Sequence, residues 1–226
     1  MHSYKQFVVR LLLAMLLVLL SLPTSMIAQW QQTAGPEGAS IYSFATISTA
    51  NDTNLFAGIF SGGVALSTNN GTSWTNVSTG LTVGDRRNAF VKSLAVIPNG
   101  VSGTNLFAGA APGGVFLSTN NGTNWTAVNE GLEMSFSTII SLAVSGKNLF
   151  AATNVTGVWL STDNGTSWTN VSAGLTNTYV RSLAVSGTNL FAGTNGGVFL
   201  STDNGTSWTE VNNGLDQLVV NTLAVI

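Results

Sequence analysis

The stretch that decides the fold is an eight-residue phrase that occurs four times, as Ser67-Thr-Asn-Asn-Gly-Thr-Ser-Trp74, Ser118-Thr-Asn-Asn-Gly-Thr-Asn-Trp125, Ser161-Thr-Asp-Asn-Gly-Thr-Ser-Trp168 and Ser201-Thr-Asp-Asn-Gly-Thr-Ser-Trp208. The tryptophans that end these copies are 51, 43 and 40 residues apart. A period of this length is typical of arrays in which one supersecondary unit is stacked on the next. We therefore examined the sequence around each copy for a common frame.

The fourth copy shows this frame best, with short apolar segments at 180–185, 189–193, 197–201 and 207–211. The segments are rich in Val, Leu, Phe and Ala, are bounded by Gly, Asn and Ser-Gly, and lack helical spacing. This pattern predicts four strands per repeat, arranged as an antiparallel meander. We predict no helix after the first 28 residues.

Strands such as 182–185 and 197–200 are almost continuously apolar, which predicts that both faces of each sheet are buried. Sheets that are each sandwiched between two like sheets meet this condition. The sequence therefore predicts an all-β fold, a β-propeller of four-stranded antiparallel blades.

The phrase itself predicts a hairpin turn. Asn164-Gly165 supplies the positive φ angles of a tight two-residue connection, and Asp163 can accept hydrogen bonds from the backbone amides that follow it. Trp168 then anchors the hairpin by burying its ring. We expect the phrase to be structural.

The phrases resemble the Asp-box, or BNR, repeat of sialidases, sortilin-type receptors and photosystem II assembly factors, whose pattern is Ser-x-Asp-x-Gly-x-Thr-Trp. Asn69, Asn120 and Asn124 depart from this pattern, but Asn can still accept the hydrogen bonds of the turn. The resemblance implies propeller blades whose boxes are structural rather than catalytic. The matching box residues are Asn69, Gly71, Trp74, Asn120, Gly122, Trp125, Asp163, Gly165, Trp168, Asp203, Gly205 and Trp208.

The repeats predict four complete blades at about 41–77, 90–128, 139–171 and 180–211, within a repeat domain of residues 29–226. Partial strands remain at 29–33, which contains Trp30 and matches a fourth strand, and at 219–226, which matches a first strand. We interpret the chain as a fragment of a propeller with about five to eight blades. The alternative is a five-bladed ring that lacks strands or is completed by a partner strand or a dimer.

Residues 1–28 match a secretory signal peptide, because Lys5 and Arg10 precede an apolar run from Leu11 to Leu20. An uncleaved membrane anchor is the alternative, and both predictions place the rest of the chain outside the cytoplasm. We expect no membrane insertion after cleavage.

Composition excludes several classes of protein. Without Lys5 and Arg10, five basic residues stand against nine acidic ones, and no basic patch for nucleic acid exists. There is no cysteine, and the only histidine is His2, which excludes cysteine nucleophiles, serine triads and most zinc sites. Each phrase also carries at most one carboxylate, which is too few for calcium. We predict no catalytic residue, no metal and no cofactor.

Residues that differ between the copies indicate a ligand-binding rim. They lie in the connectors that follow each fourth strand and at the start of each first strand. At the start of the first strand, the equivalent residues of successive repeats are Tyr42, Lys92, Ile140, Arg181 and Asn221. The alternative is that these loops simply tolerate change. The candidate rim residues are Asp85, Arg86, Arg87, Lys92, Phe136, Tyr179, Arg181 and Asp216.

These observations predict an exported, non-catalytic scaffold that binds an unidentified protein or glycan. Two alternatives are a fragment of a sialidase-type exo-glycosidase and a cell-surface adhesive repeat module. A sialidase site needs three converging arginines, whereas Arg86 and Arg87 are adjacent and only Arg181 lies elsewhere. Carboxylates outside the phrases show no paired spacing; they are Glu37, Asp52, Asp85, Glu130, Glu133, Glu210 and Asp216.

Overall fold

The computed structural model describes residues 35–36, 39–48, 53–60, 62–83, 87–100, 103–133 and 137–225, without the side chains of 83, 87 and 88. Residues 33–226 form one compact unit. The predicted signal peptide and the predicted strand 29–33 lie outside the described residues. Within the described part of the chain, no helix is long and apolar enough to cross a membrane.

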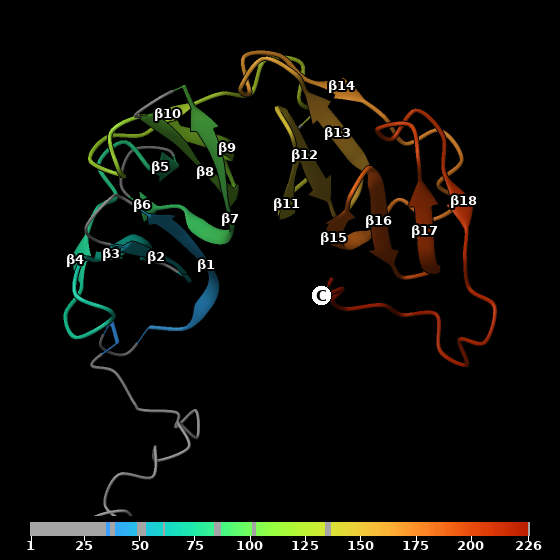
Figure 1. Ribbon diagram of the computed structural model, residues 1–226, viewed down its shortest axis with the longest axis horizontal. Coiled ribbons are helices and arrows are strands. Elements are labelled where there is room, and N and C mark those ends of the chain that lie inside the picture. The colour runs from blue at the N-terminus through green and yellow to red at the C-terminus, as the bar shows by residue number, and fades with distance from the viewer. Residues whose placement is uncertain are drawn as a thin grey trace, which may run out of the picture. The chain divides into compact units, whose positions relative to one another are not determined.

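The strands form four antiparallel sheets of four strands each, in chain order (Figure 1). Sheet 1 contains β1 (Ile41–Ser48), β2 (Thr53–Ile59), β3 (Gly63–Ser67) and β4 (Thr75–Asn76). Sheet 2 contains β7 (Phe90–Asn99), β8 (Gly103–Ala111), β9 (Gly114–Ser118) and β10 (Thr126–Ala127). Sheet 3 contains β11 (Ile139–Ser145), β12 (Asn148–Thr153), β13 (Val158–Ser161) and β14 (Thr169–Asn170), and sheet 4 contains β15 (Val180–Ser186), β16 (Asn189–Thr194), β17 (Gly197–Ser201) and β18 (Thr209–Glu210).

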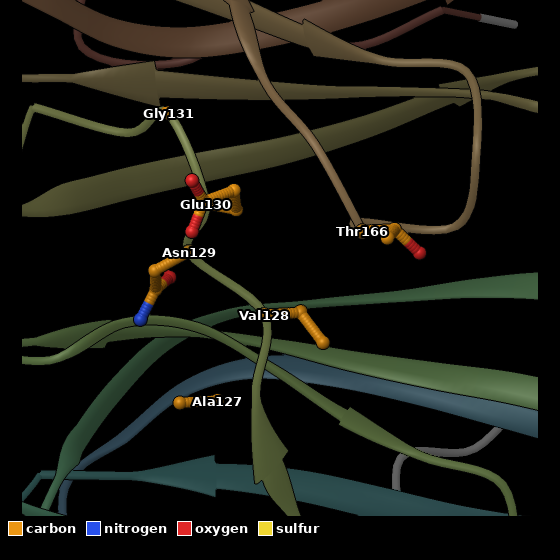
Figure 2. A pocket seen from close by; sticks show the side chains of 6 residues that line it. All are labelled: Ala127, Val128, Asn129, Glu130, Gly131 and Thr166. Atoms are coloured by element: carbon orange, nitrogen blue, oxygen red, sulfur yellow. The ribbon is translucent and has the colours of Figure 1, made fainter.

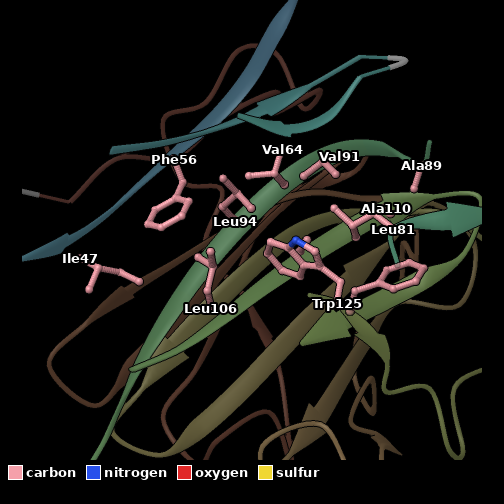
Figure 3. Packing of buried hydrophobic residues seen from close by; sticks show 12 residues of the cluster. Ile47, Phe56, Val64, Leu81, Ala89, Val91, Leu94, Leu106, Ala110 and Trp125 are labelled. Carbon is pink, nitrogen blue, oxygen red and sulfur yellow. The ribbon is translucent and has the colours of Figure 1, made fainter. Parts of the chain in front are cut away.

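The sheets pack face to face through their apolar side chains. One buried cluster joins sheets 1 and 2, where Phe56 contributes from β2 and Val91 from β7, with Trp125 beside them (Figure 3). Two further clusters join sheets 2 and 3 and sheets 3 and 4. Sheets 2 and 3 are therefore covered on both faces, as the continuous apolar strands predict.

The two ends of the sheets differ in what they carry. Because strands alternate in direction, all four turn phrases lie at one end, which we call the phrase end. The connectors to the next sheet and the starts of β1, β7, β11 and β15 lie at the other end, which we call the connector end. In the first connector, β5 (Thr82–Val83) pairs with β6 (Arg87–Asn88), a small ribbon that the repeat pattern does not predict.

The connection inside each phrase is longer than the predicted two-residue turn. In sheet 3, Leu160 pairs with Thr169 and β13 ends at Ser161, so residues 162–168 form the connection. Asn164 and Gly165 do have positive φ angles of 58° and 84°. The loop is longer because side-chain hydrogen bonds, rather than a tight backbone turn, hold it.

Residues 219–225 form no assigned strand, although they match the first strand of a repeat. They nevertheless lie along sheet 4, because the Val220 amide donates to the Thr194 carbonyl and the Leu223 amide donates to Ser182 Oγ at 3.1 Å. Leu142 and Leu183 make the same bond to Ser93 and Ser141 of the preceding sheets. The segment therefore occupies the position of a first strand.

Candidate functional site at the connector end

Each first strand carries a β-bulge near its start. The pairing register shifts between Ile41 and Ser43 in β1, and the same shift follows Val91, Ile139 and Val180 in the other sheets. The bulged residues are Tyr42, Lys92, Ile140 and Arg181. A bulge frees one residue from the ladder and redirects its side chain, and bulges are common beside binding sites. We call these four residues the bulge rim.

The bulges belong to strands that pack on one another, since β1 contacts β7, β7 contacts β11, and β11 contacts β15. The four variable side chains are thus presented in sequence along the connector end. Their chemistry changes from an aromatic ring in sheet 1 to a guanidinium in sheet 4. The strand frame is constant, and the residue at the bulge differs from one repeat to the next.

An aromatic cluster surrounds the bulge of sheet 1. The Tyr42 ring lies 5.8 Å from Phe60, and Phe60 stacks on Phe90 with ring centroids 4.6 Å apart. Tyr42 is 53% exposed and Phe60 is 46% exposed. Exposed aromatic rings that group together are typical of binding surfaces, because they bury large areas at a small cost in side-chain entropy.

A polar cluster surrounds the bulge of sheet 4. Arg181 Nε donates to Asn195 Oδ1, and Arg181 Nη1 donates to Asn221 Oδ1 at 3.1 Å. The Arg181 guanidinium also lies 5.0 Å from the centre of the Tyr179 ring, which is half-exposed. These contacts fix the guanidinium in place at the surface.

The structure brings Tyr179 and Arg181 together, and it places Lys92, half-buried, at the bulge of β7. Asp216 is exposed in the connector after β18. Arg87 lies in β6, where only its backbone is described, and Asp85, Arg86 and Phe136 lie outside the described residues. The assignment of these eight residues to a ligand stays a prediction.

Sequence reasoning missed Phe60, Phe90 and Asn195. Phe60 follows β2 at the position where Asn154 and Asn195 follow β12 and β16, and Phe90 directly precedes buried Val91, as Tyr179 precedes Val180. Aligning the copies at these two positions would have shown aromatic residues where other copies are polar.

The turn phrases are closed networks of hydrogen bonds. Ser161 Oγ accepts from the Gly165 amide at 2.7 Å and donates to Asp163 Oδ1 at 2.8 Å. Asp163 Oδ1 also accepts from the Ser167 amide at 2.9 Å, and Oδ2 accepts from Ser167 Oγ at 2.6 Å. These bonds from Ser167 hold the pKa of Asp163 below its ordinary value of 3.8. The carboxylate is therefore engaged in holding its own loop.

A surface hollow of about 540 Å³ lies between the fourth strand of sheet 2 and the phrase of sheet 3 (Figure 2). Val128, Glu130 and Thr166 are among its lining residues. The Val128 and Glu130 carbonyls already accept from Trp168, and Glu130 is the ionisable residue of the lining. The hollow lies where sheets 2 and 3 meet. Its lining contains no second carboxylate that could act as the acid–base partner of Glu130.

Six carboxylates lie in the described part of the chain. The carboxylates described there, of Glu130, Glu133, Asp163, Asp203, Glu210 and Asp216, are all exposed. No group of three or more His, Cys, Asp or Glu side chains could hold a metal within those residues. Glu37, Asp52 and Asp85, which the sequence also offered, lie outside them.

No protein-family model matches the chain, and no curated protein matches it. Solved structures do match. An ancestral GH74 enzyme aligns with a TM-score of 0.65 at 23% identity, over 84% of this chain and 28% of that enzyme. YCF48 bound to D1 peptide aligns with a TM-score of 0.57 at 16% identity, over 77% of this chain and 56% of that protein.

The fold is a β-propeller. The neighbours and the four four-stranded sheets confirm this prediction and, at the level of the fold, the resemblance to propellers such as photosystem II assembly factors. A further match is the extracellular domain of a hybrid two-component system from B. thetaiotaomicron, with a TM-score of 0.61 at 14% identity over 86% of this chain and 25% of that one. The chain thus spans about a quarter of the length of two of these propeller proteins. Each of its four-stranded sheets is one blade.

Proposed function

We propose that this chain is an exported, non-catalytic scaffold that binds a ligand at the bulge rim. The observation that carries the proposal is the aromatic cluster of exposed Tyr42, exposed Phe60 and partly buried Phe90, which lies at the same end of the blades as Arg181. A soluble surface does not need three grouped aromatic rings, whereas a binding surface uses them.

Support for export comes from the signal-peptide pattern in residues 1–28 and from the fold of an extracellular domain. Support for binding a protein comes from YCF48, which was solved with a peptide bound. Because only 7% of the residues are charged, aromatic stacking and neutral hydrogen bonds would dominate recognition at the rim.

The test compares three immobilised proteins: the wild type, a rim variant with Tyr42→Ala and Phe60→Ala, and a control variant with Lys147→Ala. Lys147 lies between β11 and β12 at the phrase end, far from the bulges along every strand. Each protein is exposed to the extracytoplasmic fraction of the host, and a retained molecule is purified and titrated by calorimetry. We expect the rim variant to bind at least about tenfold more weakly, since two aromatic contacts are each worth about 1 kcal/mol or more. Equal binding by all three proteins contradicts the proposal.

A second candidate function is glycoside hydrolysis, because the neighbours include GH74 enzymes. Incubation of the wild type with a fluorogenic sialoside and a fluorogenic β-glucoside decides between the two. Turnover that persists through purification and disappears in a variant of one exposed carboxylate, such as Glu133→Gln, refutes the non-catalytic proposal. An adhesive module is the third alternative, and it predicts attachment of the purified protein to cell surfaces.

A further inference from the structure

Every turn phrase contains an Asn-Gly pair, and asparagine followed by glycine is chemically labile. The glycine amide nitrogen can attack Cγ of the asparagine side chain, because glycine has no Cβ that shields the nitrogen. The nitrogen loses its proton to solvent, ammonia leaves from Cγ, and a five-membered imide forms. Water then opens the imide to aspartate or isoaspartate. The four pairs are Asn70-Gly71, Asn121-Gly122, Asn164-Gly165 and Asn204-Gly205.

The geometry of the phrase requires this labile pair. In blade 3, Asn164 and Gly165 have positive φ angles of 58° and 84°, in a region that glycine and asparagine adopt more readily than other residues. A Cβ on Gly165 would also lie 2.9 Å from Cγ2 of Val128 in the preceding blade, and Gly205 stands at the same distance from Val171. A more stable pair would therefore disturb both the turn and the packing between blades.

The serine that opens each phrase holds the nitrogen that would attack. Ser161 Oγ accepts from the Gly165 amide at 2.7 Å, and Gly165 is buried whereas Asn164 is exposed. To reach Cγ of Asn164, the Gly165 nitrogen must break this buried hydrogen bond and give up a proton that solvent does not reach. The other three phrases make the same bond at 2.7–2.9 Å, from Gly71, Gly122 and Gly205 to Ser67, Ser118 and Ser201.

Asn99-Gly100, in the hairpin between β7 and β8, lacks this protection. The residue four positions before Gly100 is Val96, which has no hydroxyl group. Asn99 and Gly100 are both exposed, and no atom of the described residues lies within 4 Å of a Cβ built on Gly100. Solvent therefore reaches the pair at the nitrogen that would attack.

Asn195-Gly196, which follows β16, is protected by a different hydroxyl. Thr194 Oγ1 accepts from the Gly196 amide at 2.9 Å, and the side-chain oxygen of Asn195 accepts from Arg181 Nε. Both the attacking nitrogen and the attacked side chain are therefore held. The contrast with Asn99-Gly100 comes from these hydrogen bonds, because the two pairs have the same sequence.

We propose that Asn99 is a site of spontaneous deamidation, and that the phrase serines protect the Asn-Gly pairs of the turns from the same reaction. Asn99 Nδ2 donates to Oδ1 of Asn105 at 3.1 Å, and Asn105 is only 3% exposed. A carboxylate at position 99 loses this donor and adds a negative charge. An isoaspartate also adds a carbon to the backbone where Asn99 pairs with Gly103, which loosens the hairpin of blade 2.

The test follows each Asn-Gly pair of the purified chain by peptide mass spectrometry during incubation in mildly alkaline buffer. The same chain in urea gives the rate of each pair without structure. We expect the phrase asparagines to react at least about tenfold more slowly in the native chain than in urea, because attack must break a buried hydrogen bond. Asn99 should react within about threefold of its rate in urea, because its hairpin is exposed.

Three variants of one phrase test the serine itself. Ser161→Ala removes the acceptor, so Asn164 should react at least about tenfold faster than in the wild type. Thr162→Ala is the matched control, because it changes an exposed neighbouring side chain and leaves the serine in place. Asp163→Ala removes the acceptor of the Ser167 amide but keeps the serine, and it should accelerate Asn164 less than Ser161→Ala does.

The other three phrases of each variant report whether its fold is retained, because unfolding would accelerate all four pairs together. Four results overturn the proposal: phrase asparagines that react as fast in the native chain as in urea, Asn99 that reacts as slowly as they do, no acceleration by Ser161→Ala, or equal acceleration by Asp163→Ala. The last would assign the protection to the loop as a whole. The readout involves no ligand, so it is independent of binding at the bulge rim.

Discussion

Asp163 and Asn69 hold equivalent loops with different chemistry. The Asn69 Oδ1 accepts from the Ser73 amide at 2.9 Å, as Asp163 Oδ1 does from Ser167, but Asn69 Nδ2 donates to Ser73 Oγ where Asp163 Oδ2 accepts from Ser167 Oγ. The serine hydroxyl can act as donor or acceptor, so it adapts to either partner. Blades 3 and 4 therefore carry an ionisable turn, and blades 1 and 2 carry a neutral one.

This difference predicts that acid destabilises blades 3 and 4 more than blades 1 and 2. Hydrogen bonds from Ser167 and Ser207 lower the pKa of Asp163 and of Asp203 below 3.8 in the folded chain. A carboxyl group whose pKa is lower in the folded chain than in the unfolded chain stabilises the fold when it is ionised. This stabilisation is present above the unfolded pKa, at about pH 4, and is lost as the pH falls through the folded pKa. We expect the double variant Asp163→Asn/Asp203→Asn to have a lower Tm than the wild type at pH 7, with a difference that shrinks below pH 4.

Thermal unfolding from pH 2 to pH 7 measures this effect. Asp216→Asn is the matched control, because Asp216 is exposed and accepts no hydrogen bond from the described residues. A Tm difference that stays constant down to pH 2 would show that the two carboxylates contribute nothing through their charge.

At the scale of the strand and the turn, the glycine after each fourth strand decides how closely the blades approach. Gly131 combines a φ of 84° with the close approach of the Trp168 carbonyl, whereas Gly187 has a φ of 59° and open space. Gly131→Ala should therefore lower the free energy of unfolding by about 1 kcal/mol because of the positive φ angle. The clash of the new Cβ with the Trp168 carbonyl should lower it by about 1–3 kcal/mol more. Gly187→Ala should cost only the backbone part, about 1 kcal/mol.

Urea unfolding of the two alanine variants against the wild type gives both costs. The larger loss for Gly131→Ala reflects a contact between elements rather than a local preference. Equal losses at the two positions would mean that the blades separate slightly at no cost, and that the spacing is not fixed by this glycine.

The same scale explains what the sequence could predict. Strands and phrases were predictable because apolar patterning and Asn-Gly are local signals, as the φ of 58° at Asn164 shows. The bulges at Lys92 and Arg181 were not, because a bulge depends on the pairing register with the next strand. The length of the phrase loop was misjudged because the Ser161–Asp163–Ser167 network replaces a tight turn.

The candidate site was predicted only in part, for a related reason. Comparing copies located variable Arg181 and Tyr179, which do touch. The stacking of Phe60 on Phe90 joins the end of one blade's second strand to the start of the next blade's first strand, which no single repeat contains. Contacts between repeats, rather than within them, carry the information that the sequence pattern lacks.

At the scale of the whole chain, stability should differ between inner and outer blades. Each blade contacts only its neighbours, so the array behaves as a row of units joined by nearest-neighbour contacts. Blades 2 and 3 contribute side chains to two buried clusters each, and blades 1 and 4 contribute to one each. We expect the weakest join between blades 1 and 2, because Ser43 Oγ is buried without a partner in the described structure, whereas Ser93 and Ser141 both accept an amide at that position.

We therefore expect local opening to begin at blade 1. Native-state hydrogen exchange should show the slowest amides in β8 and β12, which are sandwiched between buried clusters, and faster exchange in β2, the equivalent strand of blade 1. The expected order at low protein concentration is β12 and β8 slowest, β16 intermediate and β2 fastest. Peptides that cover the three turns Gly146–Lys147, Gly187–Thr188 and Gly100 serve as fully exchanging references, because each lies at an exposed hairpin. Uniform protection of all four blades would mean that the chain opens only as a whole, and would remove the unpaired Ser43 as the cause of a weak join.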